Sequence, residues 1–286
     1  MSKTGIEISG YAPDHLSYST VDGYKTCGKR FELQKVIGVE QRPGLAALGG
    51  NAVHTATELW DLGQHAQQVT PTAQELFVHS WEQEVAARRE QSPSYEVEDY
   101  VKTGRASAAY GGKRNLDWWM DNGPGMVQAW IDWRESSGWH LWELPDGSPA
   151  VEVELLIELP GGYPVKMFID RVMVTPAGQI VVLDIKTGRI PETAEQLGLY
   201  AYGLAQEFGE ENRPTWGYFW HPEKGHGSPQ SIDMYTGDYF SEQARMAVAG
   251  INAGCFLPKV QMGCGGWCGV AQWCTAVGGT APDFSL

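Results

Sequence analysis

The chain has 286 residues, 42% of them hydrophobic, and a formal net charge of −14 at pH 7. This length suffices for one large domain with a sizeable core. No stretch approaches the roughly 18–20 apolar residues of a membrane helix, and the N-terminus lacks the apolar block of a secretory signal, so we expect a cytoplasmic protein with no membrane partner. The charge argues against a general nucleic-acid coat, which depends on neutralising phosphates. It leaves open an enzyme whose bound cations invert the local electrostatics.

The N-terminal part, residues 11–149, is predicted to be mainly helical. A short helix should begin after Ser17 or Ser19, either of which can serve as its N-cap. Thr72 fits a capping box, and 93–125 is polar with scattered Gly and Pro, which indicates a loop or mobile lid. Apolar residues at helical spacing predict further helices over 51–65, 72–91 and 126–137.

From residue 150 the apolar spacing changes to a period of two. Three consecutive strands follow, separated by the turn signals "PGGYP" and "TPAGQ" and predicted over 150–159, 164–174 and 180–186. A helix, a strand and a last helix are then expected over 192–207, 215–221 and 239–254. The pattern predicts one α/β (mixed α+β) domain over 1–286, with a mostly antiparallel-to-mixed sheet flanked by helices and its catalytic part within 150–222.

The strand "VVLDIKTG" (181–188) carries an acid and a base near its end. Side chains alternate along a strand, so Asp184 and Lys186 share one face. An isolated D-x-K is most often an ion pair at a sheet edge. Here Asp170 ends the preceding apolar run, "VKMFID", and a hairpin would place it beside Asp184. Two close carboxylates are unfavourable unless a cation binds between them, and hard oxygen ligands suit Mg²⁺ or Mn²⁺.

Two pairs at i, i+4 spacing accompany this strand. His54 and Glu58 share one helix face, and the imidazole is a candidate third metal ligand. Gln196 and Tyr200 share a face of the helix after the strand, where the amide can position water or phosphate. Lys186 can stabilise negative charge that develops on a phosphate. Taken alone, either helical pair is more often structural.

The ordered series G-N-A-V-H (50–54), I-D-R-V (169–172), V-V-L-D-I-K-T-G (181–188) and Q-L-x-x-Y (196–200) resembles the PD-(D/E)XK nuclease superfamily. More narrowly, it is similar to the RecB-like branch, with its CRISPR-associated adaptation exonucleases and AddB-type nuclease domains. The resemblance implies a restriction-endonuclease-like core, in which a helix, three antiparallel strands, a helix and a further strand follow one another. The proline that precedes the first acid in the superfamily is replaced by Ile169.

The resemblance also assigns roles to residues. His54, Asp170, Asp184 and the carbonyl of Ile185 would bind Mg²⁺ or Mn²⁺. Lys186 would be the catalytic lysine, supported by Gln196 and Tyr200. Candidate DNA contacts are Lys25, Lys29 and Arg30, which lie in the basic segment 24–42, and Arg171.

The activity implied is a metal-dependent deoxyribonuclease, an exonuclease more than an endonuclease, acting on single-stranded DNA or DNA ends in replication, recombination or repair. The alternative is a catalytically silent DNA-end-binding or scaffold protein of the same fold. No P-loop motif is present, so any ATP-driven unwinding would belong to a replication or recombination partner. The length suits a bacterial or phage source, and the sequence does not predict an oligomeric state.

The five cysteines are unevenly placed: Cys27 lies near the start, and the other four lie in the last 32 residues. Three of these four have a C-x3-C-x5-C spacing in a glycine-rich tail, which can wrap a metal centre. The resemblance implies a 4Fe–4S cluster that joins the two ends of the chain, with ligands Cys27, Cys264, Cys268 and Cys274. Zn²⁺ stays an alternative because four thiolates suit it equally. Cys255 could substitute for one of these ligands, but a cysteine that follows helix-like residues is more often simply buried.

Overall fold

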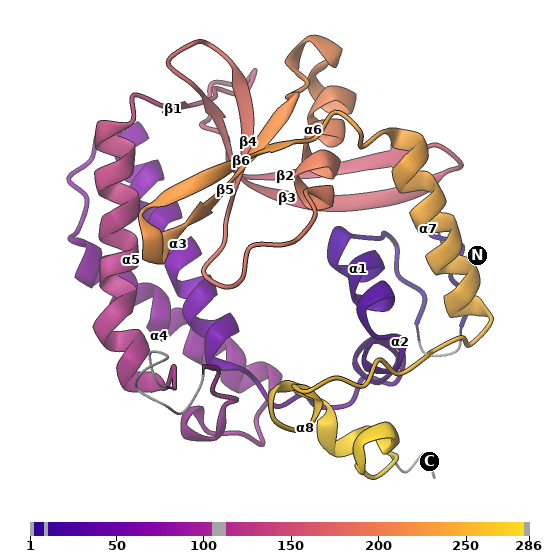
Figure 1. Cartoon of the computed structure of the whole chain (residues 1–286). Helices are drawn as coiled ribbons and strands as arrows, with labels where there is room; N and C mark the ends of the chain where they lie inside the picture. Colours follow the sequence, from indigo (N-terminus) through magenta and orange to yellow (C-terminus); the bar gives the residue numbers. More distant parts are fainter. Residues whose placement is uncertain (1–2, 9–10, 105–112, 283–286) are drawn as a thin grey trace.

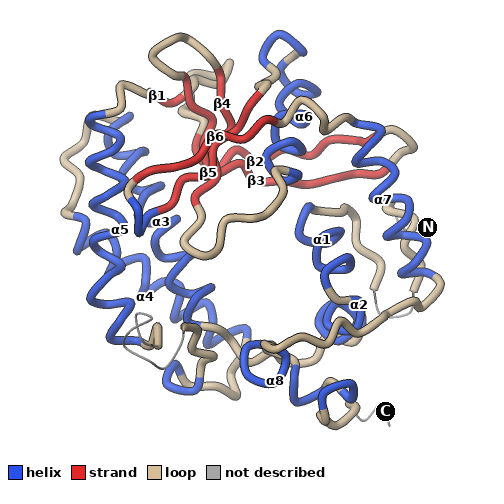
Figure 2. The backbone as a smooth tube through the Cα atoms, in the orientation of Figure 1, coloured by secondary structure: helices blue, strands red, loops and turns tan. Residues whose placement is uncertain are grey.

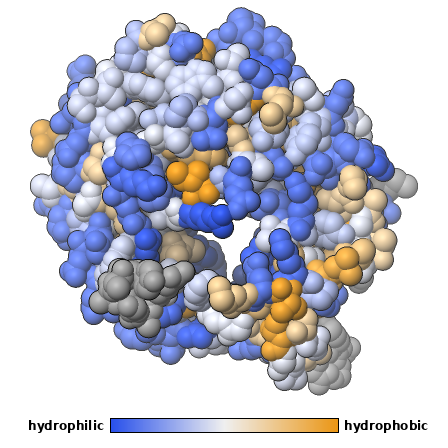
Figure 3. All heavy atoms as spheres, in the orientation of Figure 1, coloured by the Kyte–Doolittle hydropathy of each residue, from blue (hydrophilic) through white to orange (hydrophobic). Residues whose placement is uncertain are grey.

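The computed structural model describes residues 3–8, 11–104 and 113–282. A sheet lies across the top of Figure 1, helices α3 to α5 descend on one side, and helices α1 and α2 stand on the other. The tube in Figure 2 shows the C-terminal segment passing below, next to α2. The space-filling view shows an opening through the molecule, with a largely hydrophilic visible rim (Figure 3).

The N-terminal helices follow the sequence pattern closely. Helix α1 spans Tyr18–Thr26, and the side chain of Ser17 caps it by accepting a hydrogen bond from the Thr20 amide. It is followed by α2 (Gly28–Phe31) and a π-helical turn (Glu32–Val36). Helix α3 spans Leu45–His65 and α4 spans Ala73–Gln91. The capping box predicted at Thr72 is confirmed, with Glu75 as its second member.

Helix α5 begins ten residues earlier than its apolar pattern predicts and spans Leu116–Ser136, with Pro124 inside it. The predicted start of this helix, at residue 126, is therefore wrong. The reason is packing, because Gly123 lies against the ring of Phe77 on α4, and a Cβ at Gly123 would approach that ring to 2.1 Å. Close helix contact overrides the local Gly-Pro signal. Residues 105–112 of the expected lid lie outside the described residues.

The sheet confirms the predicted mixed α/β architecture. Strands β2 (Val151–Leu159), β3 (Tyr163–Val174) and β4 (Ile180–Ile185) are antiparallel neighbours, and β5 (Trp216–His221) pairs in parallel with β4. Short β1 (His140–Leu141) also pairs with β3. The sequence pattern missed the edge strand β6 (His226–Ser231), which contains Pro229. Proline is tolerated at sheet edges, where its missing N–H is not needed.

Two apolar clusters cover the two faces of the sheet. Helices α6 (Glu195–Phe208) and α7 (Gly237–Asn252) contribute to one cluster, together with α1 and α2 neighbours such as Leu16 and Phe31. Helices α3, α4 and α5 form the other, which includes Trp130 and Trp220. None of the described helices is long and apolar enough to cross a membrane.

The C-terminal tail after α7 contains α8 (Cys264–Trp267) and two short 3-10 turns, Ala271–Trp273 and Thr275–Val277. Backbone hydrogen bonds attach it to the N-terminal arm. The amide of Lys29 donates to Leu257 O (3.3 Å), and the amide of Arg42 donates to Gly269 O (2.9 Å). The tail therefore packs against the N-terminal arm next to α2.

Candidate active site

Three neighbouring strands each contribute one carboxylate to a row. The β3–β4 register pairs Arg171 with Leu183, so the preceding Asp170 lies opposite Asp184. The β2–β3 register pairs Val151 with Arg171 and Val153 with Ile169, which places Glu152 opposite Asp170 on the other side. The sheet thus sets the carboxylate row, which we define as Glu152, Asp170 and Asp184.

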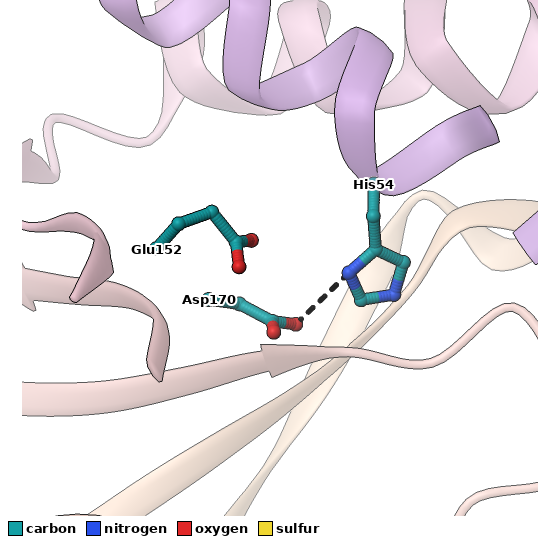
Figure 4. Close-up of side chains that lie close together, drawn as sticks. All are labelled: His54, Glu152 and Asp170. Atoms are coloured by element: carbon teal, nitrogen blue, oxygen red, sulfur yellow. Dashed lines mark ion pairs between the residues drawn. The ribbon is translucent and has the colours of Figure 1, made fainter. Parts of the chain in front are cut away.

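Helix α3 supplies an imidazole to the same row. His54 Nδ1 lies 3.3 Å from Asp170 Oδ2, and one ligand atom each from His54, Glu152 and Asp170 lie within 4.8 Å of one another. Figure 4 shows these three side chains pointing toward a common space between α3 and the sheet. The Asp170 carboxylate is also fixed from behind, since its Oδ2 accepts a hydrogen bond of 2.7 Å from the Ile185 amide.

The lysine lies beside the last carboxylate of the row. Lys186 Nζ is 2.6 Å from Asp184 Oδ2, and it donates to Gln196 Oε1 at 2.9 Å. Gln196 in turn donates through Nε2 to Tyr200 OH at 2.6 Å. The two α6 residues singled out in the sequence therefore form one hydrogen-bonded chain that holds the ammonium group against the carboxylate row.

The electrostatics of the row favour a bound cation. Burial, and after it the negative charge of Asp170, raises the pKa of Asp184 to about 7. The same two causes raise the pKa of Glu152 to about 7. Burial first, and then Asp184 and Asp170, also raise the pKa of the Tyr200 phenol well above its usual value, so this hydroxyl stays protonated. Adjacent buried carboxylates of this kind share protons unless a cation neutralises them.

Comparisons with known proteins agree with this geometry. Residues 15–275 match the family model described as the PD-(D/E)XK nuclease superfamily. The chain belongs to the PD-(D/E)XK nuclease superfamily. Membership identifies it as a nuclease, a hydrolase whose substrate class is DNA, and the mixed sheet between helices fits the fold of that family.

This nuclease also resembles two curated phage proteins. It is 30% identical over 266 residues to the Gene 69 protein of Mycobacterium phage D29, covering 90% of this chain and 95% of the relative. It is 28% identical over 283 residues to the Gene 69 protein of Mycobacterium phage L5, with the same coverage. A solved structure titled "Crystal structure of SSO0001" overlaps 77% of this chain and 94% of its own at 15% identity, with a TM-score of 0.35.

Glu152 is the site residue that sequence reasoning missed. It has a positive φ of 48°, which is uncommon for a residue with a side chain, and such outliers concentrate at functional sites. The available signal was the hairpin turn. Leu159 pairs with Tyr163 across the turn, and counting back along the two strands brings Glu152 opposite Asp170. The carboxylate belongs to the candidate metal ligands of this nuclease.

Burial leaves Arg171 inaccessible for the DNA contact expected from the sequence. Its side chain is 0% exposed and packs behind the carboxylate row. Arg171 Nε lies 2.7 Å from Asp61 Oδ2 on α3, and its Nη1 donates to Asp170 O at 2.5 Å. The fully buried Asp61 also accepts from Trp130 Nε1 and Arg134 Nε. The guanidinium thus ties α3, which carries His54, to the strand that carries Asp170.

The donor set of the row fits a divalent cation. Carboxylate oxygens and one imidazole nitrogen converge from two strands and a helix, and such ligands suit Mg²⁺ or Mn²⁺. The row is also held rigidly, by the Ile185 amide on one side and the Arg171 network on the other. The residues present therefore fit the metal that the nuclease superfamily uses.

The other basic candidates lie along the N-terminal arm. Lys25 Nζ pairs with Glu195 Oε2 at 3.0 Å, at the start of α6, and Lys29 pairs with Glu32. Arg30 lines a surface cavity between the arm, α4 and α8. Their contacts with DNA stay predictions.

The metal centre expected at the cysteines stays a prediction. The sulfurs of Cys27 and Cys264 flank one tail segment, since Cys27 accepts from the Lys259 amide (3.4 Å) and Cys264 accepts from the Gln261 amide (3.3 Å). The four proposed ligands are all half-buried. Cys255 is exposed, so its expected burial is wrong: it follows the end of α7, and its carbonyl rather than its thiol is held, by Tyr24 OH.

Proposed function

We propose that this nuclease is a divalent-metal-dependent DNA exonuclease of the RecB-like branch, hydrolysing phosphodiester bonds in single-stranded DNA or at DNA ends. The carboxylate row carries the proposal. It combines three acids from adjacent strands, two of which lie within 4.8 Å of His54, with the Lys186 ammonium at 2.6 Å from Asp184. A merely structural ion pair does not need three carboxylates in one place.

His54, Glu152, Asp170, Asp184 and the Ile185 carbonyl would hold Mg²⁺ or Mn²⁺ in this proposal. Bound there, the ion supplies an acidified water and a Lewis acid for the scissile phosphate. The site residues keep this space polar and negatively charged, which matches a cation and repels a bare phosphate.

Lys186 would contact the scissile phosphate or the attacking water. Its ammonium is held between Asp184 and Gln196, so it is oriented before the substrate arrives. A fixed charge stabilises the negative charge that develops in the transition state without reorganising at that moment. Tyr200 holds Gln196 in turn and donates no charge of its own, because its hydroxyl stays protonated.

The opening through the molecule favours an exonuclease over an endonuclease. The loop 186–194, which begins with Lys186, borders this opening in Figure 1, and the rim of the opening in Figure 3 is largely hydrophilic. A strand that reached Lys186 through this opening would have to enter by a free end. We place this activity in DNA replication, recombination or repair, and the similarity to two phage proteins fits action in the cytoplasm of a bacterial host.

The test is an assay of the wild type and Lys186→Ala on end-labelled single-stranded DNA with Mn²⁺. We expect the variant to lose about 10²–10³-fold in kcat. Lys166 lies on the outer part of β3 and pairs with Glu154 on β2. Lys166→Ala should therefore keep its activity. Cleavage of linear but not circular single strands would support exonuclease action. A wild type that binds DNA without cutting it would favour the silent scaffold instead.

A 4Fe–4S cluster on Cys27, Cys264, Cys268 and Cys274 is the second part of the proposal, supported by the meeting of Cys27 with the tail. Among the described residues, no three thiolates lie within 4.8 Å of one another. Zn²⁺ stays the alternative, because four thiolates suit it equally. An absorbance band of the anaerobically purified protein that dithionite bleaches would support it. A colourless, zinc-loaded protein would contradict it.

A further inference from the structure

A cavity of about 630 Å³ lies away from the carboxylate row, between three segments that are distant in sequence. The N-terminal arm contributes Arg30 and Arg42, the C-terminal end of α4 contributes Arg88, and α8 contributes Trp267. Its volume lies in the range of sites that hold one small organic ligand, about 300–1,000 Å³. A nucleotide-sized group fits, and a duplex does not.

The cavity is basic in an acidic protein. Three arginines line it against one carboxylate, Glu40, whose Oε1 is engaged by the Ser94 amide at 3.0 Å. Within the described ranges, neither Arg30 nor Arg42 forms a salt bridge with a carboxylate, and Arg88 lies only at 4.0 Å from Glu84 Oε2. Arg42 Nε donates to the Asp99 carbonyl oxygen at 2.5 Å, which orients the guanidinium without neutralising it, so its positive charge is available to an anionic ligand. Planar guanidinium groups match phosphate oxygens well.

An aromatic face accompanies the arginines. Trp267 is 52% exposed and is held in place by Gly263, where a Cβ would approach its ring to 2.8 Å. A fixed, exposed indole beside cations is the combination that binds single-stranded nucleic acid, because an unpaired base stacks on the ring while the backbone contacts the charges. A base-paired duplex offers no free base face to it.

Helix α3 connects the cavity to the carboxylate row. Ala46 and Ala47 at its start line the cavity, and His54 lies seven residues further, about 10 Å along the helix. Ala47, Gly50 and His54 share one helix face. Between them, Thr187 of the loop after Lys186 rests on Gly50, where a Cβ would approach Thr187 Oγ1 to 2.7 Å. A single strand bound in the cavity would thus reach the proposed catalytic centre within a few nucleotides.

We infer that this cavity is a subsite for single-stranded DNA, in which Arg30, Arg42 and Arg88 contact phosphates and Trp267 stacks on a base. The inference rests on the proposed nuclease function and extends it. It makes the N-terminal arm and the cysteine tail, including the proposed cluster ligand Cys268, together a part of substrate binding, away from the carboxylate row.

The experiment measures binding of labelled oligo(dT) of about 12 nucleotides by fluorescence anisotropy, with EDTA present so that no cutting occurs. Arg42→Gln combined with Arg88→Gln should weaken binding and reduce the slope of log K against log salt by about 0.7 for each phosphate that the protein no longer neutralises. Trp267→Leu should weaken binding about 5-fold or more, while Trp267→Phe, which keeps an aromatic face, should stay close to wild type.

The matched control is Arg245→Gln on α7, which removes an exposed arginine paired with Glu242 and should leave binding unchanged. In Mn²⁺, the cavity variants should raise KM for long single strands and keep kcat. Unchanged affinity and salt slope in the double arginine variant, or an equal loss of duplex binding, would overturn the subsite. A wild type that binds oligo(dT) in the expected way but never cuts it would refute the nuclease function and leave the subsite standing.

Discussion

The carboxylate row and the cysteine tail obtain their order from different sources. Each acid of the row extends from a strand with apolar clusters on both faces of the sheet, and Asp184 itself is 1% exposed. In the described part of the tail after α7, Val270 alone is buried, and backbone hydrogen bonds to the N-terminal arm hold the segment. One region is positioned by the core and the other by contacts at the surface.

The difference shows why the two regions need different chemistry. Core packing fixes the row before any metal binds, so its ligands are pre-organised at the cost of mutual repulsion. The tail has too little apolar burial to offset its conformational entropy, so a metal centre that joins Cys27 to the tail would supply the missing stability. Substitutions should therefore affect one region without the other.

Arg171→Gln should give the largest effect on the sheet region. It removes one partner of the buried Asp61, a loss that typically costs 3–5 kcal/mol. We expect about 3 kcal/mol, since Arg134 still pairs with Asp61. Urea unfolding measures it, with the exposed Arg245→Gln as the control. A loss below about 1 kcal/mol would mean that the network does not hold α3 to the sheet.

Cys27→Ser should instead release the tail. If the metal concentration is about 100 times the Kd of the centre, losing the centre lowers the free energy of unfolding by about 2.7 kcal/mol. Limited proteolysis should then cut within 255–282 while the sheet domain stays intact. Cys255→Ser, at the exposed cysteine outside the proposed centre, is the matched control. Equal cutting in both variants would rule out a cysteine centre that holds the tail.

The stability of the metal-free protein should depend on pH through the carboxylate row. The pKa values of Glu152 and Asp184 are raised from 4.5 and 3.8 to about 7, so the folded protein binds more protons than the unfolded chain between about pH 4 and 7. Stability in EDTA should therefore fall as pH rises through this window. Asp170→Asn, which removes the shared repulsion, should flatten the curve. A curve that rises with pH would contradict the assignment.

Much of this fold is predictable from local pattern. Strands β2 to β5, the cap at Ser17 and the capping box at Thr72 follow from side-chain periodicity and cap chemistry, and D-x-K with Q-x-x-x-Y locates the residues around Lys186. These features depend on neighbours within a few residues.

The features that sequence reasoning missed depend on long-range contacts. The burial of Arg171 depends on Asp61, 110 positions away, and the early start of α5 depends on Gly123 meeting Phe77. Glu152 enters the row through strand register, and the arginine cavity needs three distant segments to meet. Periodicity contains none of this information.

Manganese binding, followed by electron paramagnetic resonance at pH 8, tests the central claim most directly. We expect that the wild type binds Mn²⁺, that Asp170→Asn loses most of this binding, and that Cys255→Ser keeps it. If Asp170→Asn bound Mn²⁺ as tightly as the wild type, the carboxylate row would not be the metal site of this nuclease.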